Sequence, residues 1–235
     1  MSGDLIVPGV GDPWPADPEA ARAVQERLAG RVRPEALEAD AVSVVAGLDV
    51  TYAVDEERLV AAAVVMTADT LEVVETSVVT ARPRFPYVPG LFAFRELPPL
   101  LEAVDRLRVR PDVYVCDGYG LAHPRRFGLA CHLGVLLDRP ALGVAKSAFV
   151  GRTEAPAAQR GAWSELREGE EVLGRALRTR EGVKPVYVSV GHRVDLEGAT
   201  RLVLRLTPRY RLPEPIRRAD QLSRGVLAGR TASSG

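Results

Sequence analysis

The order of the apolar segments along the chain constrains the fold most. Residues 42–50 form a nearly continuous run of β-branched and small apolar side chains, which is typical of a buried strand. Two further strands are predicted over 59–66 and 71–79, and Ala68-Asp69 between them favours a hairpin. Later strands are predicted over 113–116, 141–145 and 186–190, with short peripheral strands within 151–180. Three successive strands followed by alternating helices and strands predict an α/β fold, a mixed central β-sheet flanked by helices on both faces.

Helices are predicted between and after these strands. The first begins at Asp17-Pro18, because proline suits the first helical position, and its apolar face is predicted as Ala20, Ala23, Val24 and Leu28. The second follows Gly90 and is expected to break at Pro98-Pro99. Others are expected over 125–137 and 195–206, with a last short helix after Pro215.

No internal repeat and no linker divides the 235 residues. We therefore expect one domain over residues 17–225, which is long enough to bury a substantial core. Residues 1–16 are rich in Gly, Pro and Asp and are predicted to form a flexible N-terminal arm, and residues 226–235 a flexible C-terminal tail.

Composition narrows the class of protein. No apolar run reaches the length of a membrane span, and the N-terminus lacks the basic start and apolar core of a signal peptide. The two cysteines, Cys116 and Cys131, make neither a disulfide framework nor a zinc-ligand pattern, so both are expected to be reduced and structural. A cytoplasmic protein without a membrane partner is predicted, and we expect a monomer.

Charge is unevenly distributed although the net charge is zero. Residues 201–230 contain eight arginines against two acids, a basic end that can serve as a footprint for nucleic acid. The alternative is an ordinary solvated face. Lys146 and Lys184 are the only lysines, which suggests that an ammonium group is needed where one remains.

A rigid turn carrying one aromatic ring precedes the second helix. Pro86 and Pro89 bracket Tyr87, and Gly90 lets the backbone turn or approach a ligand closely. Tyr87 is therefore displayed on a stiff tip, a few residues before Glu96 near the helix start. Such a tip can push a ring into a base stack while the carboxylate lies near the adjacent phosphate. The alternative is a strand-to-helix loop with a surface tyrosine.

Three acids stand where solubility alone would not place them. Asp49 lies on the first buried strand, Asp117 ends a later strand, and Glu96 lies near a helix start. Carboxylates at strand ends of such sheets commonly converge at a ligand crevice, and they repel one another unless a cation lies between them. Hard divalent cations such as Mg²⁺ take oxygen ligands and can assist hydrolysis of a phosphodiester. The alternative is that Asp49 caps a turn and Asp117 bonds the glycine loop that follows it.

The loop after Asp117 carries further candidates. Glycines at 118 and 120 allow close approach of the backbone to a planar ligand, and His123 can orient water or contact a phosphate. Arg125 and Arg126 can meet phosphates at the start of a helix. Lys146 ends a buried strand, where an ammonium group can stabilise charge developing on a phosphate. The alternative for Lys146 is a snorkelling side chain.

Five blocks in this order resemble the endonuclease V family over about residues 17–222. They are VAGLDV at 45–50, PYVPG at 86–90 with FRE at 94–96, DGYGLAHPRRFG at 117–128, GVAKS at 143–147 and YRLPEP at 210–215. The resemblance implies a ribonuclease H-like fold and a nuclease that uses Mg²⁺, or Mn²⁺ in its place. It also implies action on DNA containing deoxyinosine (deaminated adenine), with hydrolysis of the second phosphodiester bond 3′ of the lesion, leaving a 3′-hydroxyl and a 5′-phosphate.

The resemblance also implies roles for individual residues. Asp49, Glu96 and Asp117 match the catalytic metal-binding carboxylates, Tyr87 the strand-separating wedge, Lys146 the catalytic lysine and His123 the active-site histidine. Asp220 matches a position where relatives carry an acid or a histidine near the metals. The pocket for the flipped base is matched by Gly90, Leu91, Gly118, Gly120 and Leu129. Tyr119 departs from relatives, which often have a smaller or amide-bearing residue, so it alters the expected pocket wall, and Cys131 stands where Ser is common.

Three alternatives remain open from the sequence. Another ribonuclease H-like nuclease, such as a junction resolvase, would share the acids but would not need the segment 86–90. A non-catalytic nucleic-acid-binding module would not need all three acids together with Lys146. An inosine-specific endoribonuclease of the same family would recognise the same base in RNA.

Overall fold

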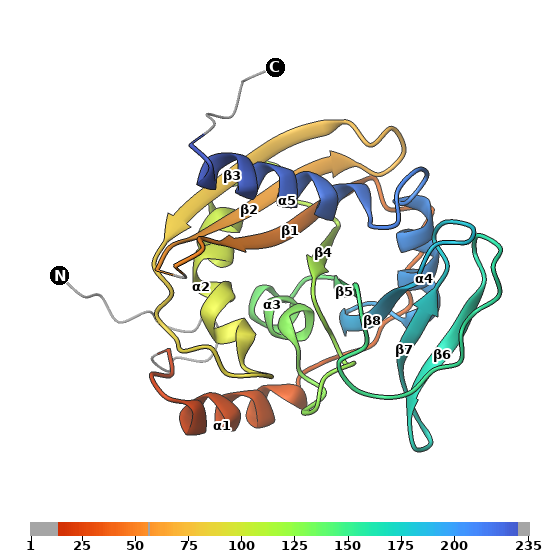
Figure 1. Ribbon diagram of the computed structural model, residues 1–235, viewed down its shortest axis with the longest axis horizontal. Helices are drawn as coiled ribbons and strands as arrows, with labels where there is room; N and C mark the ends of the chain where they lie inside the picture. Colours follow the sequence, from red (N-terminus) through yellow and green to blue (C-terminus); the bar gives the residue numbers. More distant parts are fainter. Residues whose placement is uncertain (1–13, 56, 230–235) are drawn as a thin grey trace.

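A single mixed sheet of eight strands organises the molecule (Figure 1). The computed structural model describes residues 14–55 and 57–229. The strands lie in the order β3-β2-β1-β4-β5-β8-β7-β6. The β1–β4 and β4–β5 pairs are parallel, and all the other neighbours are antiparallel. The strands are β1 Val44–Tyr52, β2 Leu59–Thr67, β3 Val73–Ala81, β4 Val113–Asp117, β5 Ala141–Ala145, β6 Trp163–Glu168, β7 Glu171–Leu177 and β8 Val186–His192.

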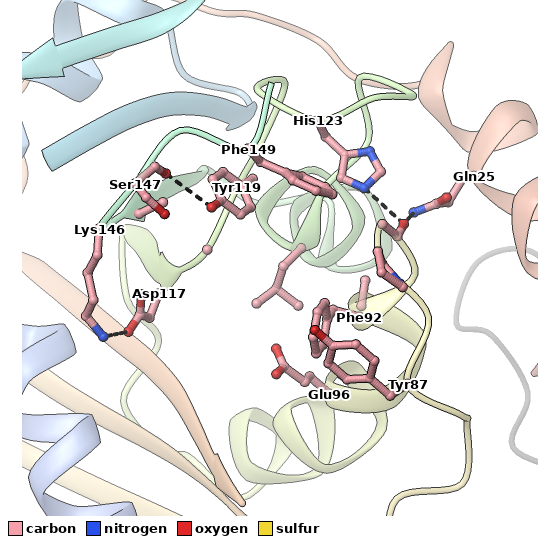
Figure 2. Close-up of a pocket in the computed structure, with 17 residues that line it drawn as sticks. Gln25, Tyr87, Phe92, Glu96, Asp117, Tyr119, His123, Lys146, Ser147 and Phe149 are labelled. Carbon is pink, nitrogen blue, oxygen red and sulfur yellow. Dashed lines mark hydrogen bonds and ion pairs between the residues drawn. The ribbon is translucent and has the colours of Figure 1, made fainter. Parts of the chain in front are cut away.

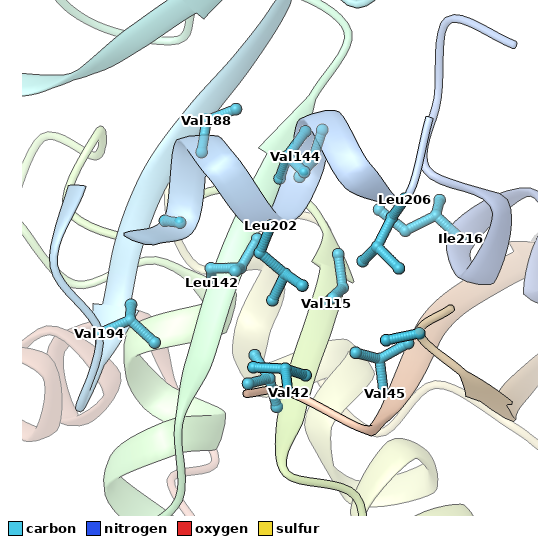
Figure 3. Close-up of a cluster of buried hydrophobic side chains, with 14 of the residues drawn as sticks. Val42, Val45, Val115, Leu142, Val144, Val188, Val194, Leu202, Leu206 and Ile216 are labelled. Carbon is cyan, nitrogen blue, oxygen red and sulfur yellow. The ribbon is translucent and has the colours of Figure 1, made fainter. Parts of the chain in front are cut away.

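Helices cover both faces of the sheet, as predicted. They are α1 Pro18–Ala29, α2 Phe92–Asp105, α3 Leu129–Leu137, α4 Leu196–Arg205 and α5 Glu214–Leu227. On one face, α4 and α5 cover a core cluster that includes Val45, Val115 and Leu202 (Figure 3). On the other face, α2 and α3 cover a second cluster, and α1 packs outside α3.

The order of the strands follows the predicted apolar runs, with ends shifted by one or two residues. The β2 strand is buried along nearly its whole length, as its run of Val, Ala and Met requires, and it forms the predicted hairpin with β3. The β3 strand begins two residues later than predicted, because Leu71 has a left-handed backbone (φ 57°) and belongs to the turn.

The prediction that the second helix breaks at Pro98-Pro99 is wrong, since α2 runs through both prolines. Pro98 has no N–H to donate to the carbonyl of Phe94, four residues earlier. The indole N–H of Trp14 donates to that carbonyl instead, at 2.9 Å. Glu96 therefore lies in the second turn of a continuous helix.

The predicted loose arm ends sooner than expected. Trp14 hydrogen-bonds to α2 and its ring is stacked on that of His132, with centroids 5.7 Å apart. Residues 14–16 thus belong to the domain side of the boundary, and residues 1–13 lie outside the described residues. At the other end, α5 extends to Leu227 and has 14 residues, so it is not short; residues 230–235 also lie outside the described part.

Two helices differ from the predictions in detail. Asp17 caps α1 as expected, but the buried face is Ala21, Val24, Gln25 and Leu28, while Ala23 is exposed. The helix predicted over 125–137 begins only at Leu129, since Arg126 has a left-handed backbone (φ 53°). The α4 helix begins after its predicted cap, Asp195, whose side chain accepts from the N–H of Gly198.

The α5 helix lies against β1 at unusually close range. A Cβ added to Gly47 would lie 2.1 Å from the carbonyl carbon of Pro215, so only glycine allows this approach. The contact brings the C-terminal helix over the strand that carries Asp49, two residues beyond Gly47. Glu214 and Pro215, the last two residues of the YRLPEP segment, form the start of α5, so this segment makes the close contact.

Two predictions from composition, on the cysteines and on membrane spans, can be compared with the structure. Cys116 and Cys131 are both free and buried. Among the described residues, no helix is long and apolar enough to cross a membrane.

Candidate active site

Two of the predicted carboxylates lie on neighbouring parallel strands. Asp49 lies on β1 and is 8% exposed, and Asp117 is the last residue of β4. The Asp49 Oδ2 atom accepts from the hydroxyl of Ser223 on α5 at 3.1 Å, and the Ser223 and Thr51 hydroxyls are 2.7 Å apart. Helix α5 therefore fixes one oxygen of Asp49 from above the sheet.

Glu96 approaches from α2 on the other face of the sheet. Its carboxylate accepts from the hydroxyl of Tyr52 at the end of β1, with 3.3 Å between the Tyr52 hydroxyl and Oε1. The guanidinium of Arg95 lies over the ring of Tyr52, 4.8 Å from the centroid. The strand β1 and its flanking helices thus bring Glu96 and Asp49 toward one centre.

The electrostatics show that these acids share a site. Burial, followed by the charges of Asp117 and Asp220, raises the pKa of Asp49 to about 7, against the opposing hydrogen bond from Ser223. Burial, followed by the charge of Asp49, raises the pKa of Glu96 to about 8. Carboxylates that are buried and also repel one another hold protons unless a cation compensates their charge.

Lys146 follows β5 and reaches back to Asp117. Its ammonium nitrogen lies 2.8 Å from Asp117 Oδ2, and the side chain is half exposed. Burial opposes the charge of Lys146, but the hydrogen bond and charge of Asp117, with the charges of Asp49 and Asp220, outweigh it and raise the pKa above its usual value. Lys146 stays a cation in this site.

Arg211 secures the main chain beneath Lys146. One guanidinium nitrogen, Nη2, donates to the carbonyl of Lys146 at 2.6 Å and to that of Pro185 at 2.7 Å. Two loops distant in sequence are thereby joined under the lysine.

Asp220 lies on α5 within electrostatic reach of the same centre, where its charge acts on Asp49 and Lys146. Its carboxylate also accepts from Nε of Arg224 at 2.7 Å. The structure therefore brings Asp220 to the edge of the acid cluster, already paired with an arginine.

A cavity of about 410 Å³ opens beside the acid cluster (Figure 2). Glu96, Asp117 and Lys146 border it, so the acids and the cavity form one site. Its size is within the range of small-molecule pockets. The predicted residues that line it are Tyr87, Gly90, Glu96, Asp117, Gly118, His123, Leu129 and Lys146.

Tyr87 lies at the mouth of this cavity and is 57% exposed. Its ring meets Phe92 edge-on, with centroids 4.7 Å apart and an interplanar angle of 88°. Phe85, two residues earlier, is buried and packs on Phe94. The loop is thus anchored by one aromatic ring and presents the other to solvent.

Tyr119 and Phe149 form the opposite wall. Their ring centroids are 5.3 Å apart, and the Tyr119 hydroxyl donates to the carbonyl of Ser147 at 3.1 Å. The Tyr119 side chain therefore lines the cavity and ties the β4–α3 loop to the segment that follows Lys146 (Figure 2).

Leu91 and Gly120 lie behind the cavity and do not line it as predicted. Leu91 is fully buried among the side chains under the loop. Gly120 packs on β8, where an added Cβ would lie 1.9 Å from the carbonyl oxygen of Val190. Both residues support the wall from its far side.

His123 borders the cavity, but main-chain groups occupy both of its ring nitrogens. Its Nδ1 accepts from the N–H of Arg125 at 3.2 Å, so Nε2 carries the hydrogen and donates to the carbonyl of Gly90 at 2.9 Å. Burial, followed by the charge of Arg125, lowers the pKa of His123 to about 4. The ring is neutral and held, which differs from the expectation that it orients water or contacts phosphate.

Neither predicted phosphate-binding arginine lies at a helix start. Arg125 donates from Nη2 to the carbonyl of Gly90 at 2.8 Å and from Nε to Oε1 of Gln25 at 2.5 Å. Arg126 pairs with Glu168 and Glu171 of the β6–β7 hairpin. Both guanidinium groups therefore bind the protein itself in this structure.

The donor set fits a hard divalent cation, although the side chains do not form a closed cage. Asp49, Glu96 and Asp117 offer only oxygen ligands, and the mutual repulsion of their charges is the condition that a cation would relieve. In the described part of the chain, no three acidic, His or Cys side chains are placed to enclose an ion. Mg²⁺ is commonly bound through one or two carboxylates, with water and substrate phosphates completing its shell.

Several residues of the site were not predicted from the sequence. Ser223 and Thr51 hold Asp49, Phe149 completes the cavity wall, and Gln25 reaches the loop of Gly90 from α1. Gln25 did carry a signal, since it is a polar residue on the same helical face as Val24 and Leu28.

The Endonuclease V family model matches residues 26–221. Endonuclease V of Streptomyces avermitilis is 54% identical over 220 residues, which cover 93% of this chain and 96% of that protein. A crystal structure of Endonuclease V from that organism superposes with a TM-score of 0.87 at 53% identity, covering 93% of this chain and 96% of that one. Endonuclease V of Ciona intestinalis, crystallised with a 23mer DNA containing an inosine followed by a ribo-adenosine, superposes with a TM-score of 0.80 at 29% identity, covering 90% of this chain and 97% of that one.

The mixed sheet with an acidic site on its central parallel strands defines a ribonuclease H-like protein. Within that class, the chain belongs to the endonuclease V family, which makes it a nuclease.

Proposed function

We propose that this protein is a DNA repair endonuclease that recognises deoxyinosine and hydrolyses the second phosphodiester bond on its 3′ side. The observation that carries the proposal is the junction of two features, a cavity bordered by Tyr87 and Gly90 and an acid cluster with Lys146 at its edge. One feature suits a displaced base and the other suits a nearby phosphate. The inosine-containing DNA bound by the Ciona relative supports the same ligand class.

In this proposal, the cavity receives a base that has been unstacked from the duplex. Unstacking costs a few kcal/mol, and less for a mispaired base, which favours a deaminated adenine. Tyr87 is exposed at the mouth, so its ring can fill the gap that the base leaves. Hypoxanthine lacks the 2-amino group of guanine and the 6-amino group of adenine. A close wall around Gly90 and Gly118 therefore excludes guanine, while main-chain donors can bond the 6-oxo edge.

Asp49, Glu96 and Asp117 would hold Mg²⁺, or Mn²⁺ in its place. Such a cation would withdraw charge from the scissile phosphate and favour ionisation of the attacking water. Ser223 orients Asp49 for this task through its hydrogen bond to Oδ2. Lys146, held as a cation by Asp117, stabilises the negative charge that develops on the phosphate. Hydrolysis would leave a 3′-hydroxyl and a 5′-phosphate, and no base would be excised.

A second candidate is an inosine-specific endoribonuclease. The ligand of the Ciona relative contains a ribo-adenosine directly after the inosine, and this observation favours a test of both sugars. We also propose that the protein acts as a monomer. The two buried free cysteines are consistent with a reducing, cytoplasmic compartment.

One nicking experiment tests the proposal. DNA and RNA strands of the same sequence, each with one inosine, are incubated with the protein in Mg²⁺, in Mn²⁺ and in chelator, and the ends are mapped. If the proposal is right, the DNA strand is nicked at the second phosphodiester bond 3′ of the inosine. The nick appears with either metal and does not appear in chelator. Cleavage confined to RNA would favour the second candidate, and equal cleavage of inosine-free strands would overturn both.

A further inference from the structure

One main-chain oxygen near the cavity mouth accepts three hydrogen bonds. The carbonyl of Gly90 accepts from Nε2 of Gln25 at 3.0 Å, from Nε2 of His123 at 2.9 Å and from Nη2 of Arg125 at 2.8 Å. Figure 2 shows Gln25 and His123 converging on this oxygen. A carbonyl oxygen has two lone pairs, so three donors from separate side chains hold it unusually firmly.

Gln25 connects the three-donor arrangement to the rest of the fold. It is fully buried on α1, and its second amide hydrogen bonds the carbonyl of Phe127 at 3.1 Å. Its Oε1 accepts from Nε of Arg125, which orients that guanidinium toward Gly90. Every polar atom of this buried amide is therefore used, and it joins segments 65 and 102 residues away.

The bonded oxygen lies in the loop that presents Tyr87. Gly90 has a left-handed backbone (φ 79°), and the N–H of Leu91 closes the turn by donating to the carbonyl of Val88 at 2.9 Å. A loop that must enter a base stack loses efficiency if it also samples other conformations, because ordering it then opposes insertion. The position of Gly90 relative to α1 and to the β4–α3 loop is therefore a condition for a rigid tip.

We infer that Gln25 is a positioning residue for base displacement. By holding the Gly90 carbonyl together with His123 and Arg125, it keeps the Tyr87 loop in the conformation that enters the duplex. His123 and Arg125 thereby act on the loop rather than on water or phosphate. This inference rests on the proposed recognition of inosine, and it adds a role for α1, which contributes no acidic residue to the site.

The test compares a paired lesion with an unpaired one. Gln25→Met keeps a similar volume and removes the three hydrogen bonds that the Gln25 amide makes, to Gly90, Phe127 and Arg125. Gln25→Glu replaces the donor with an acceptor facing the Gly90 carbonyl. Arg125→Met removes one donor from a less buried side chain and serves if the Gln25 variants fold poorly. Gln159→Glu is the matched control for the same chemical change at an exposed position, and Leu202→Ala on α4 controls for loss of stability alone.

Single-turnover cleavage is measured on duplex DNA with a paired inosine and on the same strand with the inosine in an unpaired bulge. For the Gln25 variants we expect the paired substrate to slow by about tenfold or more while the bulge substrate stays near wild type, because only the paired substrate needs the loop for displacement. Equal slowing on both substrates, or no slowing on either, would overturn the inference.

Hydrogen exchange without nucleic acid separates this inference from the proposed function. Peptides covering residues 84–92 should exchange faster in Gln25→Met than in wild type or in Leu202→Ala. Unchanged exchange would overturn the inference even if the wild-type protein cuts inosine DNA. Conversely, a wild-type protein that ignores inosine would refute the proposed function, while faster exchange in the variant would still show that Gln25 holds the loop.

Discussion

The ammonium nitrogen of Lys146 lies 2.8 Å from Oδ2 of Asp117, at the ends of two neighbouring parallel strands, β5 and β4. The charge of Lys146 also acts on Asp49, whereas the other lysine, Lys184, is exposed two residues before β8. In the proposed mechanism, this charge stabilises the negative charge that develops on the attacked phosphate.

Lys146→Met is therefore expected to slow the chemical step more than binding. We expect a single-turnover rate reduced by about a hundredfold or more at nearly unchanged affinity for lesion DNA. Cleavage and affinity are measured on the same preparation, with Lys184→Met as the matched control. A normal rate at saturating enzyme with weaker, less salt-dependent binding would instead identify Lys146 as a phosphate anchor.

Asp49→Asn and Asp117→Asn are expected to nearly abolish nicking in Mg²⁺ while the protein stays folded. Each change removes one of the carboxylates that would hold the cation, so Mn²⁺ binding measured by calorimetry should weaken as well. Asp105→Asn, an exposed acid at the end of α2, is the control. Either active-site variant cutting at the wild-type rate would show that its carboxylate binds no required metal.

Tyr87→Ala is expected to reduce the preference for inosine-containing over plain duplex. The lost stacking should cost roughly 1–3 kcal/mol in the lesion complex and much less in the plain one. The measurement is the ratio of the two dissociation constants at fixed salt. Tyr87→Phe retains the ring and should keep the wild-type ratio, so an equal ratio in all three proteins would make Tyr87 a simple loop residue.

The buried acids predict a pH dependence of the metal-free protein. Folding raises the pKa of Asp49 from 3.8 to about 7 and that of Glu96 from 4.5 to about 8. Between about pH 4 and pH 8 the folded state then binds more protons than the unfolded state, so the free energy of unfolding falls as pH rises through this window. Thermal melts in chelator at pH 5, 7 and 9 should show this decline.

The same melts contain their own controls. Asp49→Asn should flatten the decline, because it removes one of the two titrating groups. Added Mg²⁺ should restore stability at the high-pH end, where the carboxylates are ionised. A melting temperature that rises from pH 5 to pH 9 in chelator would contradict the assignment.

His132 predicts the opposite dependence at acid pH. It is fully buried against Trp14, Phe94 and Phe127, and among the described residues neither ring nitrogen has a hydrogen-bond partner. Burial lowers the pKa of His132 from 6.5 to about 3, so its contribution to stability is lost as pH falls through that interval.

His132→Phe should therefore raise the free energy of unfolding at pH 5 by about 1–2 kcal/mol, and less at pH 7, by removing a buried unsatisfied polar group. Urea unfolding at both pH values measures the difference. A variant less stable than wild type at pH 5 would show that the imidazole nitrogens have partners in solution.

Much of the fold could be predicted because the apolar runs are unambiguous. The β2 run is buried on both faces, and the Asp17 and Asp195 caps bond the helix ends as their positions indicated. The path through Pro98 could not be predicted, because the donor that replaces its N–H comes from Trp14, 80 residues from its acceptor Phe94. A local breaker signal was overridden by a tertiary contact.

The site divides in the same way. Four site residues could be proposed because a charged or aromatic side chain stands next to a strand end, a helix start or a proline-bracketed turn. The structure places all four around one cavity: Tyr87, Glu96, Asp117 and Lys146. Ser223 could not be proposed, because it acts from α5 on Asp49, 174 residues away in the sequence. Gln25 carried a signal as a polar residue on a buried helix face, but its partner at Gly90, 65 residues away, could not be predicted. For His123 and Arg125 the chemistry of the side chain suggested a ligand, while the partner they bind is a main-chain oxygen.

The close approach of Pro215 to Gly47 has a consequence for the order of synthesis. Strand β1 is synthesised early and α5 is the last helix that the structure describes. Asp49 therefore emerges from the ribosome long before its partner Ser223. Until then, the face of β1 and β2 that α5 later covers is open. We expect a nascent or C-terminally truncated chain to contain the carboxylates but to lack the hydrogen bond from Ser223 of α5 to Asp49. Cutting of nucleic acid would then begin only once the whole domain has left the translation machinery.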